Sequence, residues 1–284
     1  MAQFTNQAQL TYNNVTVNSN ITVGELLEAL TATKVAVGDT YARDGEVTYV
    51  ISLPNSGASP ITAVTVRDDL GAYPFGAGTL TPLTYVDGSV LLFINGVLQA
   101  PPTVATAPVL TFSNINIPAN GSAFLVYKAT VNEFAPLDAQ ASITNTATVS
   151  GNAIPTPVVV SETITPVSGP QLTITKSMDP TVVTENSPLT YQLVIQNYGN
   201  TAAVATDNVT ITDTFDPILS NIAVTLNGAP LVEGTDYTYD GTTGLFATVP
   251  GRIPVPAAVY VQDPVTGVLT AVPGTATLTV TGIV

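Results

Sequence analysis

Hydrophobic residues alternate with small or polar residues along most of the chain, in short runs rich in Val, Ile, Thr and Tyr. Gly, Pro, Asn and Asp interrupt these runs at short intervals. The pattern is typical of short β-strands joined by tight turns, and it predicts an all-β sandwich. The only helix-like stretch is Val23 to Leu30. Asn95-Gly96 and Asn227-Gly228 predict hairpin turns, because both residues of each pair tolerate positive φ.

The chain also contains an internal repeat, in which short motifs recur in the same order. The matching pairs are residues 31–34 with 173–176, 47–49 with 189–191, 55–57 with 197–199, 64–68 with 209–213, 93–96 with 225–228, and 118–131 with 272–284. The second copy carries an extra hairpin at about Ala258 to Val272. We therefore expect domains at residues 31–150 and 171–284, with linkers at 13–30 and 151–170.

A copy of one strand lies at the N-terminus. Residues 4–11 (FTNQAQLT) resemble residues 143–150 (ITNTATVS), which close the first repeat, whereas the second repeat has no such strand after it. We interpret residues 1–12 as a donor strand that completes the second domain of another copy. Phe4, Asn6, Ala8 and Leu10 are the side chains expected to enter that domain.

Composition removes several classes of function. The 284 residues include no Cys and no His, which excludes disulfides, thiolate nucleophiles and Cys/His zinc sites. A net charge of −14 argues against nucleic acid as a partner. No apolar run is long enough for a membrane-spanning helix. No phosphate loop, nucleophile elbow or 12-residue calcium loop is visible, so we expect no enzyme activity, cofactor or metal.

The repeated motifs resemble a bacterial surface family, the conserved Ig-like "domain of unknown function 11". Its pattern has a Lys in the first strand, a Tyr and an Asn-x-Gly next, an Asp after a Val/Ile-Thr strand, and a closing Thr-Asn-x-Ala strand. Both repeats carry the first three features, and only the first repeat carries the fourth in place. The resemblance covers most of residues 31–284. It implies two tandem Ig-like β-sandwich domains with a cell-surface or appendage role.

Three polar residues of the first repeat, two of the second repeat and one of the N-terminal strand share a strand face with apolar neighbours. Alternation along a strand places Lys34, Asp68 and Asn145 of the first repeat on buried faces. The same parity applies to Lys176 and Asp213 in the second repeat and to Asn6 in the N-terminal strand. Asp69 has the opposite parity and is expected to face outward.

Desolvation lowers the pKa of a buried Lys and raises that of a buried Asp. A neutral Lys amine could then attack an Asn side-chain carbonyl, with the Asp as proton shuttle, and form an isopeptide bond. Bacterial pilins and adhesins with Ig-like domains use such a set, and this chain is similar. We expect Lys34 to join Asn145 with Asp68 as the acid. Lys176 would join Asn6 of a neighbouring copy, with Asp213 as the acid.

Two simpler interpretations of these residues stay open. Each Lys–Asp pair could be a plain buried ion pair with Asn as a hydrogen-bond partner. A Lys near a sheet edge could also protect against edge-to-edge aggregation.

An Ig-like sandwich without its last strand exposes an edge that can accept a strand from another chain. Donor and acceptor are different surfaces, so the contact is head-to-tail and need not close. Spacing fits a continuous string of domains, since Asn145 precedes Lys176 by 31 residues (176 − 145) and Asn6 precedes Lys34 by 28 (34 − 6). Self-closure, a closed ring or a truncated chain are the competing outcomes.

The sequence thus favours a structural, homopolymeric subunit of an extracellular bacterial filament at a cell or spore surface. Met1-Ala2-Gln3-Phe4 does not look like a secretory signal, which fits release by lysis of the producing cell. The alternative is a surface adhesin or binding module. Its candidate loops are the region Tyr73 to Tyr85 and the hairpin near Asp263, with no ligand indicated.

Overall fold

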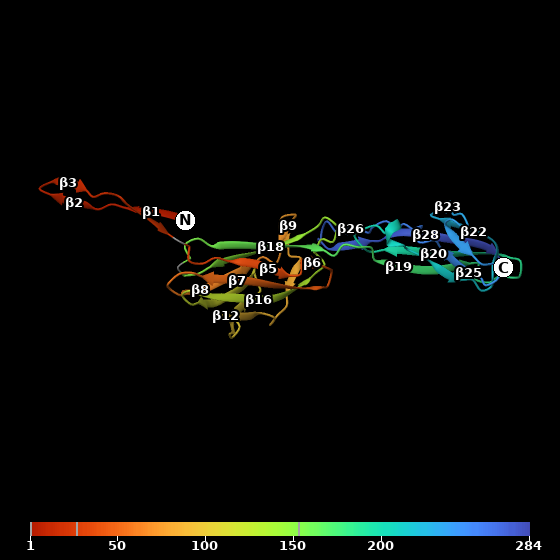
Figure 1. The fold of residues 1–284 in the computed structure, drawn as a ribbon, viewed down its shortest axis with the longest axis horizontal. Coiled ribbons are helices and arrows are strands. Elements are labelled where there is room, and N and C mark those ends of the chain that lie inside the picture. Colours follow the sequence, from red (N-terminus) through yellow and green to blue (C-terminus); the bar gives the residue numbers. More distant parts are fainter. Residues whose placement is uncertain (1, 27, 153) are drawn as a thin grey trace. The chain divides into compact units, whose positions relative to one another are not determined.

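The computed structural model describes residues 2–26, 28–152 and 154–284. Within this part of the chain almost every regular element is a β-strand (Figure 1), and the one helical element is the short 3-10 helix η1 at Ala205–Asp207. The predicted all-β sandwich class is confirmed. No helix among the described residues is both long and apolar enough to span a membrane.

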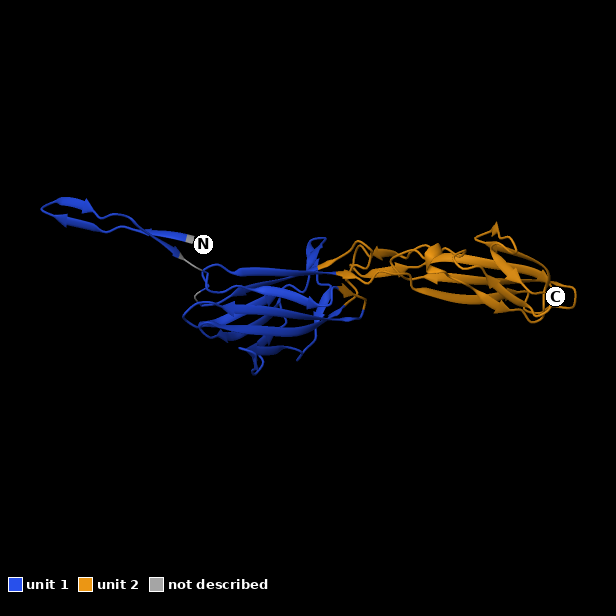
Figure 2. Cartoon of the chain, viewed as in Figure 1, with its two compact units in different colours: residues 1–39, 44–131, 144–164 blue, residues 40–43, 132–143, 165–284 orange. Residues whose placement is uncertain are grey.

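The chain divides into two compact units, which Figure 2 colours separately. Unit 1 comprises residues 1–39, 44–131 and 144–164, and unit 2 comprises residues 40–43, 132–143 and 165–284. The expected domain boundaries at 31–150 and 171–284 stay a prediction, because compactness alone does not test independent folding.

Unit 1 is built from two sheets whose inner faces form its core. The order of the first sheet is β13-β12-β16-β7-β5, with β11 also paired to β16. Its strands are β5 (Thr33–Val37), β7 (Glu46–Asn55), β11 (Leu83–Tyr85), β12 (Leu91–Ile94), β13 (Val97–Leu98) and β16 (Gly121–Val131). Alternate residues of β7, namely Tyr49, Ile51 and Leu53, are fully buried, as expected for a strand with one face inward.

The second sheet of unit 1 contains the strand that closes the first repeat. Its order is β14-β15-β8-β17-β18, so β17 lies between β8 and β18. The strands are β8 (Ile61–Asp68), β14 (Thr103–Ala105), β15 (Leu110–Ile117), β17 (Ile143–Ser150) and β18 (Val158–Pro166). The end of β18 pairs in parallel with β6 (Thr40–Tyr41). A separate hairpin joins β9 (Tyr73–Phe75) to β10 (Gly78–Leu80).

Unit 2 repeats the first of these sheets, apart from β11, which has no counterpart in the sheet as described. Its order β23-β22-β28-β20-β19 corresponds to β13-β12-β16-β7-β5. The strands are β19 (Leu172–Asp179), β20 (Pro188–Asn197), β22 (Ser220–Leu226), β23 (Ala229–Pro230) and β28 (Gly274–Ile283). The extra hairpin expected near Ala258 to Val272 is present as β26 (Val259–Gln262) and β27 (Leu269–Val272).

The second sheet of unit 2 is shorter than its counterpart. It has the order β21-β25-β24, corresponding to β8-β15-β14. These strands are β21 (Thr212–Thr214), β24 (Tyr237–Tyr239) and β25 (Leu245–Thr248). Among the described residues no strand occupies the other edge of β21, where β17 and β18 follow β8 in unit 1.

Side-chain contacts repeat between the units as well. Asn55 and Asn197 end equivalent strands, and each side-chain oxygen accepts a hydrogen bond at 2.9 Å from the backbone N–H two residues on, at Gly57 and Gly199. The predicted hairpin turns at Asn95-Gly96 and Asn227-Gly228 are confirmed. Both Asn residues have φ of 50°, and the turns join β12 to β13 and β22 to β23.

The N-terminal residues form a hairpin paired only with itself among the described strands. It consists of β1 (Ala2–Asn6), β2 (Gln9–Tyr12), β3 (Val15–Asn18) and β4 (Thr22–Leu26), with β1 paired to β4 and β2 to β3. Asn13 and Asn14 turn the chain with φ of 45° and 62°. This segment is labelled at the N-terminal end in Figure 1.

Three expectations about connecting segments need correction. Val23 to Leu30 is not helical where it is described: Thr22–Leu26 is strand β4, whose backbone groups bond to β1, and residue 27 lies outside the described residues. The stretch 13–30, expected as a linker, contains β3 and β4. The stretch 151–170, also expected as a linker, contains strand β18. Alternate side chains of β18 face inward, and one of them, Ile164, is fully buried.

Candidate functional site

The centre of unit 1 contains a buried ion pair. Lys34 points inward from β5, and its Nζ lies 2.7 Å from Oδ2 of Asp68 at the end of β8, with both side chains wholly inaccessible to solvent. Strand alternation predicts this inward direction for both residues. Asp69 faces the other way, and its Oδ1 accepts hydrogen bonds from the backbone N–H groups of Gly71 and Thr146.

A tyrosine links this pair to the third predicted residue. The hydroxyl of Tyr127, on β16, donates to Oδ2 of Asp68 at 2.5 Å. Nδ2 of Asn145, on β17, donates to the same hydroxyl at 3.3 Å. The structure therefore brings Lys34, Asp68 and Asn145 into one buried cluster through Tyr127.

The side-chain amide of Asn145 is only partly satisfied. The residue is fully buried, and its Oδ1 has no hydrogen-bond partner. A buried carbonyl oxygen without a donor is costly, and such exceptions in a native core require an explanation. A protonated acid or an oxyanion-stabilising donor would satisfy this oxygen during attack on the adjacent carbon.

Aromatic rings enclose the Lys34 amine. Nζ lies 4.8 Å from the ring centroid of Tyr49, which stacks on Tyr127 at 5.6 Å between centroids. Burial lowers the pKa of the Lys34 amine from its usual 10.5, against the opposing effect of the Asp68 carboxylate. Burial also raises the pKa values of the Tyr49 and Tyr127 hydroxyls. Burial thus shifts the Lys34 amine toward the neutral form, which is the form that acts as a nucleophile.

Unit 2 holds an equivalent pair in a more open setting. Lys176, on β19, forms an ion pair with Oδ2 of Asp213 on β21, but their side chains are 40% and 17% exposed. The Lys176 Nζ lies 4.4 Å from the ring centroid of Tyr191 and 5.3 Å from that of Phe215. Tyr191 follows Lys176 by 15 residues (191 − 176), as Tyr49 follows Lys34 (49 − 34).

Two partners of the first site have no counterpart within the described part of unit 2. Val280 pairs with Tyr191 where Tyr127 pairs with Tyr49, so the bridging hydroxyl is replaced by an apolar side chain. The candidate amide, Asn6, belongs to β1 of the N-terminal hairpin in unit 1. The structure brings together Lys176 and Asp213 of the predicted second set, without an Asn.

The face around Lys176 is uncovered. Leu172, Ile174 and Met178 share its strand face and are 37%, 52% and 44% exposed. In unit 1 the corresponding face is closed, and Ile143, Asn145, Ala147 and Val149 of β17 are all buried.

The candidate donor side chains are accessible. Phe4 is 58% exposed and Leu10 is 64% exposed, and Asn6 and Ala8 are exposed as well. Burying large apolar side chains of an isolated hairpin against another surface is energetically favourable.

Sequence reasoning missed the tyrosines of the cluster. Tyr49 and Tyr191 end the matching repeat segments 47–49 and 189–191, and their equal sequence distance from each Lys was the available signal. Tyr127 shares its inward parity with Leu125 and Ala129, which hides its polar contact among core positions.

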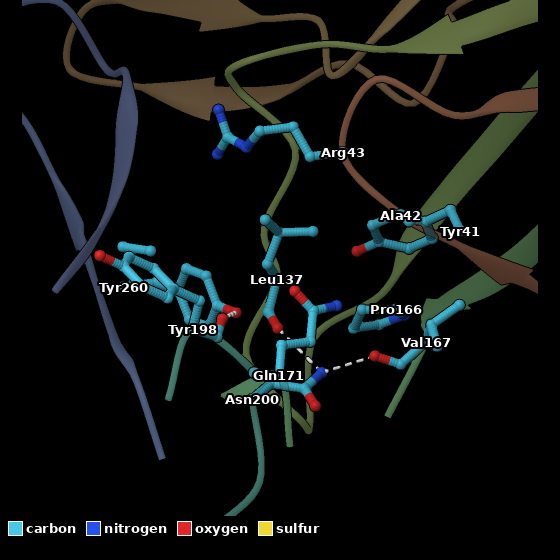
Figure 3. A pocket seen from close by; sticks show the side chains of 12 residues that line it. Tyr41, Ala42, Arg43, Leu137, Pro166, Val167, Gln171, Tyr198, Asn200 and Tyr260 are labelled. Carbon is cyan, nitrogen blue, oxygen red and sulfur yellow. Dashed lines mark hydrogen bonds between the residues drawn. The ribbon is translucent and has the colours of Figure 1, made fainter. Parts of the chain in front are cut away.

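Unit 2 also contains a cavity, shown in Figure 3, lined by Tyr41, Arg43, Leu137, Gln171, Asn200 and Tyr260 among others. Nδ2 of Asn200 donates to the carbonyls of Leu137 at 3.1 Å and Val167 at 3.0 Å. The hydroxyl of Tyr260 donates to the Tyr198 carbonyl at 2.9 Å. These hydrogen bonds hold neighbouring loops of unit 2 together. No group of three acidic side chains within the described ranges is placed to hold a metal ion.

No protein-family model and no curated protein matches the chain, so the resemblance to the domain of unknown function 11 stays a prediction. Similar solved structures include the pilus backbone RrgB of Streptococcus pneumoniae, 13% identical over 86% of this chain and 55% of that chain, with a TM-score of 0.35. ACE19, the collagen-binding subdomain of the Enterococcus faecalis surface protein ACE, is 10% identical over 50% of this chain and 99% of that one, with a TM-score of 0.32.

A family 123 glycoside hydrolase from Clostridium perfringens is 12% identical over 49% of this chain, with a TM-score of 0.31. The chain spans only 28% of that enzyme and 55% of the pilus backbone. With TM-scores of 0.35 and below, these likenesses assign no function to this chain.

Proposed function

We propose that this protein is the structural subunit of an extracellular bacterial filament, built head-to-tail from identical copies. The observation that carries the proposal is the contrast between the two Lys–Asp pairs. One is sealed by β17 with its Asn, and the other lies at an open edge. The N-terminal hairpin presents a strand with the pattern of β17, including Asn6.

In unit 1 the cluster supports an isopeptide bond formed once per chain. The Lys34 amine, after giving a proton to Asp68, attacks Cγ of Asn145. A C–N bond forms, the bond from Cγ to Nδ2 breaks, and the nitrogen leaves as ammonia after receiving a proton through Asp68. Tyr127 holds both the acid and the amide in position. The bond would tie β5 to β17, the first strand to the closing strand.

In unit 2 the same chemistry needs an amide from outside the unit. Insertion of β1 and β2 of a second copy beside β21 would satisfy backbone groups along that edge. It would also bring Phe4, Asn6, Ala8 and Leu10 over the inner face. Asn6 would then meet Lys176 and Asp213. Because donor and acceptor surfaces differ, each added copy presents a new acceptor, which gives an open chain.

Covalent links of this kind would give the filament mechanical and thermal resistance without disulfides, which a chain with no Cys cannot form. Such resistance suits a cell or spore surface exposed to the environment. The net charge of −14 keeps the subunit soluble before assembly.

Assembly is tested with a matched pair of variants of the full chain. Leu10→Lys places a charge on the face proposed to be buried, and Gln9→Lys places the same charge on the opposite face of the same strand. Electron microscopy and light scattering should show filaments from the wild type and Gln9→Lys, but not from Leu10→Lys. Filaments formed equally by all three chains would refute strand donation.

The bond within unit 1 is tested separately by intact-mass measurement on unassembled protein. The wild-type mass should be lower than the sequence mass by one ammonia, and Asn145→Ala should show its full sequence mass. Asn55→Ala, which removes another buried Asn outside the cluster, should retain the mass loss if it folds. An uncorrected wild-type mass would rule out the Lys34–Asn145 bond.

A further inference from the structure

The unit 1 sandwich is closed by two strands, not by β17 alone. Beyond β17 lies β18, whose Ile164 is fully buried. Hydroxyls of Thr144 and Thr163 meet at 2.9 Å across the two strands. The last residues of β18 then pair with β6, with Thr165 opposite Thr40. A copy of β17 would therefore supply only half of what completes unit 1.

Among the described residues, no strand pairs with residues 182–183, the counterpart of β6 in the second repeat. Thr40 follows Lys34 by six residues (40 − 34), and Val182 follows Lys176 by six (182 − 176). Asp44 and Asn186, which each follow the corresponding Lys by ten residues (44 − 34 and 186 − 176), both have positive φ, 61° and 63°. This equivalence supports an alignment without gaps over the segment. Residues 182–183 belong to no strand, and Val182 is 84% exposed. Unit 2 as described therefore lacks equivalents of two strands, β17 and β18.

The N-terminal hairpin carries a second strand that matches β18. Residues 15–17 (VTV) followed by 21–23 (ITV) resemble residues 158–160 (VVV) followed by 164–166 (ITP), with the same spacing of six residues between the first Val and the Ile (21 − 15 and 164 − 158). β2 and β3 lie side by side, as β17 and β18 do, with Leu10 opposite Val17. In the part formed by β1 and β4 the register differs by one residue, with Thr5 opposite Val23 and Asn6 opposite Thr22, so insertion of both strands would require β1 and β4 to re-pair by one residue.

The second strand carries exposed apolar side chains at alternate positions. Val15, Val17, Ile21 and Val23 have the same parity and are 49%, 49%, 59% and 63% exposed. The intervening residues Thr16, Asn18, Asn20 and Thr22 are polar. In β18 the equivalent alternation turns Val158, Val160 and Ile164 inward, while Val159 is 61% exposed.

We propose that the donor is the whole hairpin: residues 15–23 enter unit 2 of a second copy together with residues 4–11, and occupy the place that β18 has in unit 1. The proposal rests on the proposed function and extends it. The second strand would pair with residues 182–183 and cover the exposed face of β19 around Ile174 and Met178. Single-strand donation would instead leave the large apolar side chains of Val15, Val17, Ile21 and Val23 in water.

The experiment is a face scan in the full chain. Val17→Lys and Ile21→Lys charge the face proposed to be buried, and their neighbours Asn18→Lys and Asn20→Lys charge the opposite face. Leu10→Lys, which tests strand donation itself, is measured alongside. All five positions are exposed in the free chain, so the variants should fold normally.

The expected result is that Val17→Lys and Ile21→Lys raise the critical concentration for assembly at least about tenfold, as Leu10→Lys does, because an apolar contact is replaced by a buried charge. The two Asn variants should assemble as the wild type. If Leu10→Lys blocks assembly while Ile21→Lys and Val17→Lys match the Asn variants, single-strand donation stands and the hairpin proposal is overturned. If none of the variants changes assembly, both proposals fall.

Hydrogen exchange gives a second, substitution-free measurement. In assembled wild-type protein the amides of residues 15–23 should become as strongly protected as those of residues 4–11, and those of residues 182–183 should also slow. Protection of residues 4–11 without any gain at residues 15–23 would overturn the hairpin proposal.

Discussion

The two Lys–Asp pairs are made of the same residues on equivalent strands, yet they differ in almost every physical property that matters for chemistry. Lys34 and Asp68 are sealed from solvent, whereas Lys176 is 40% exposed. Each Lys amine lies over the ring of the tyrosine that follows it by fifteen residues, Tyr49 or Tyr191. The difference lies in what covers the pair: β17 and β18 close unit 1, and nothing described closes unit 2.

The comparison shows that strand register positions each Lys beside its Asp, while the closing strands set the environment of the pair. An ion pair in water is weak and unreactive, because both partners stay charged and hydrated. The same pair under a closing strand loses its hydration, and its amine shifts toward the neutral form. Under the proposed function, strand insertion would therefore both link one copy to the next and bury the Lys176–Asp213 pair.

The largest expected effect comes from removing each acid in turn. Asp68→Ala leaves the Lys34 amine buried and unpaired and should cost unit 1 about 3–5 kcal/mol of stability. Asp213→Ala in the unassembled chain removes a partly exposed partner and should cost unit 2 no more than about 1 kcal/mol. Hydrogen exchange resolved by peptide, in a denaturant series, measures both units in one sample. Equal losses would contradict the contrast between a closed and an open site.

The next largest effect is expected from removing the Tyr127 hydroxyl, which bridges Asp68 and Asn145. Tyr127→Phe removes the donor to Asp68 and the acceptor for Asn145 while keeping the ring, so it should destabilise unit 1 by about 1–3 kcal/mol. It should also slow the loss of ammonia, followed by intact mass after rapid purification. Tyr85→Phe alters another core tyrosine near the cluster and is the control. Unchanged stability and bond formation would show that Tyr127 is only a packing residue.

A pH titration separates bonded from unbonded chains. In Asn145→Ala, which cannot form the bond, the folded-state pKa of Lys34 lies below its unfolded value of 10.5. The unfolded chain then binds the extra proton, so stability should rise with pH above the folded pKa, at up to about 1.4 kcal/mol per unit. The rise should end near pH 10, because burial raises the pKa of Tyr127 above the usual 10.0 and the unfolded chain ionises first.

Chemical denaturation at a series of pH values measures this slope. The wild type should lack it, because an amide nitrogen in an isopeptide bond does not titrate. A wild type with the same slope as Asn145→Ala would indicate that Lys34 remains a free amine.

The smallest effect is expected at an exposed ion pair in the same unit. Lys128 lies 2.9 Å from Glu46, and both side chains are 49% exposed. Lys128→Ala should change the stability of unit 1 by less than about 1 kcal/mol and leave its mass loss unchanged. A thermal melt with intact-mass measurement checks both. A loss as large as that of Asp68→Ala would mean that burial is not what distinguishes the Lys34 pair.

Strand alternation was sufficient to predict the all-β class and the inward direction of Lys34, Asp68 and Asn145. It could not predict the contact through Tyr127, because parity gives a face and not a partner on the opposite sheet. It also missed β18. Residues 151–157 are rich in Gly, Pro and Asn, and this loop hides the short alternating run that follows. The same loop-like composition, with Asn13-Asn14 and Gly24, concealed β3 and β4.

The most direct test of the account is a denaturing gel of assembled filaments after boiling in detergent, with cross-linked peptides identified by mass spectrometry. The account predicts a ladder of multiples of the subunit and a peptide joining Lys176 to Asn6. Asn6→Ala filaments should collapse to monomer, and Asn18→Ala filaments should keep the ladder. A single monomer band from wild-type filaments would contradict covalent head-to-tail linkage through Lys176 and Asn6.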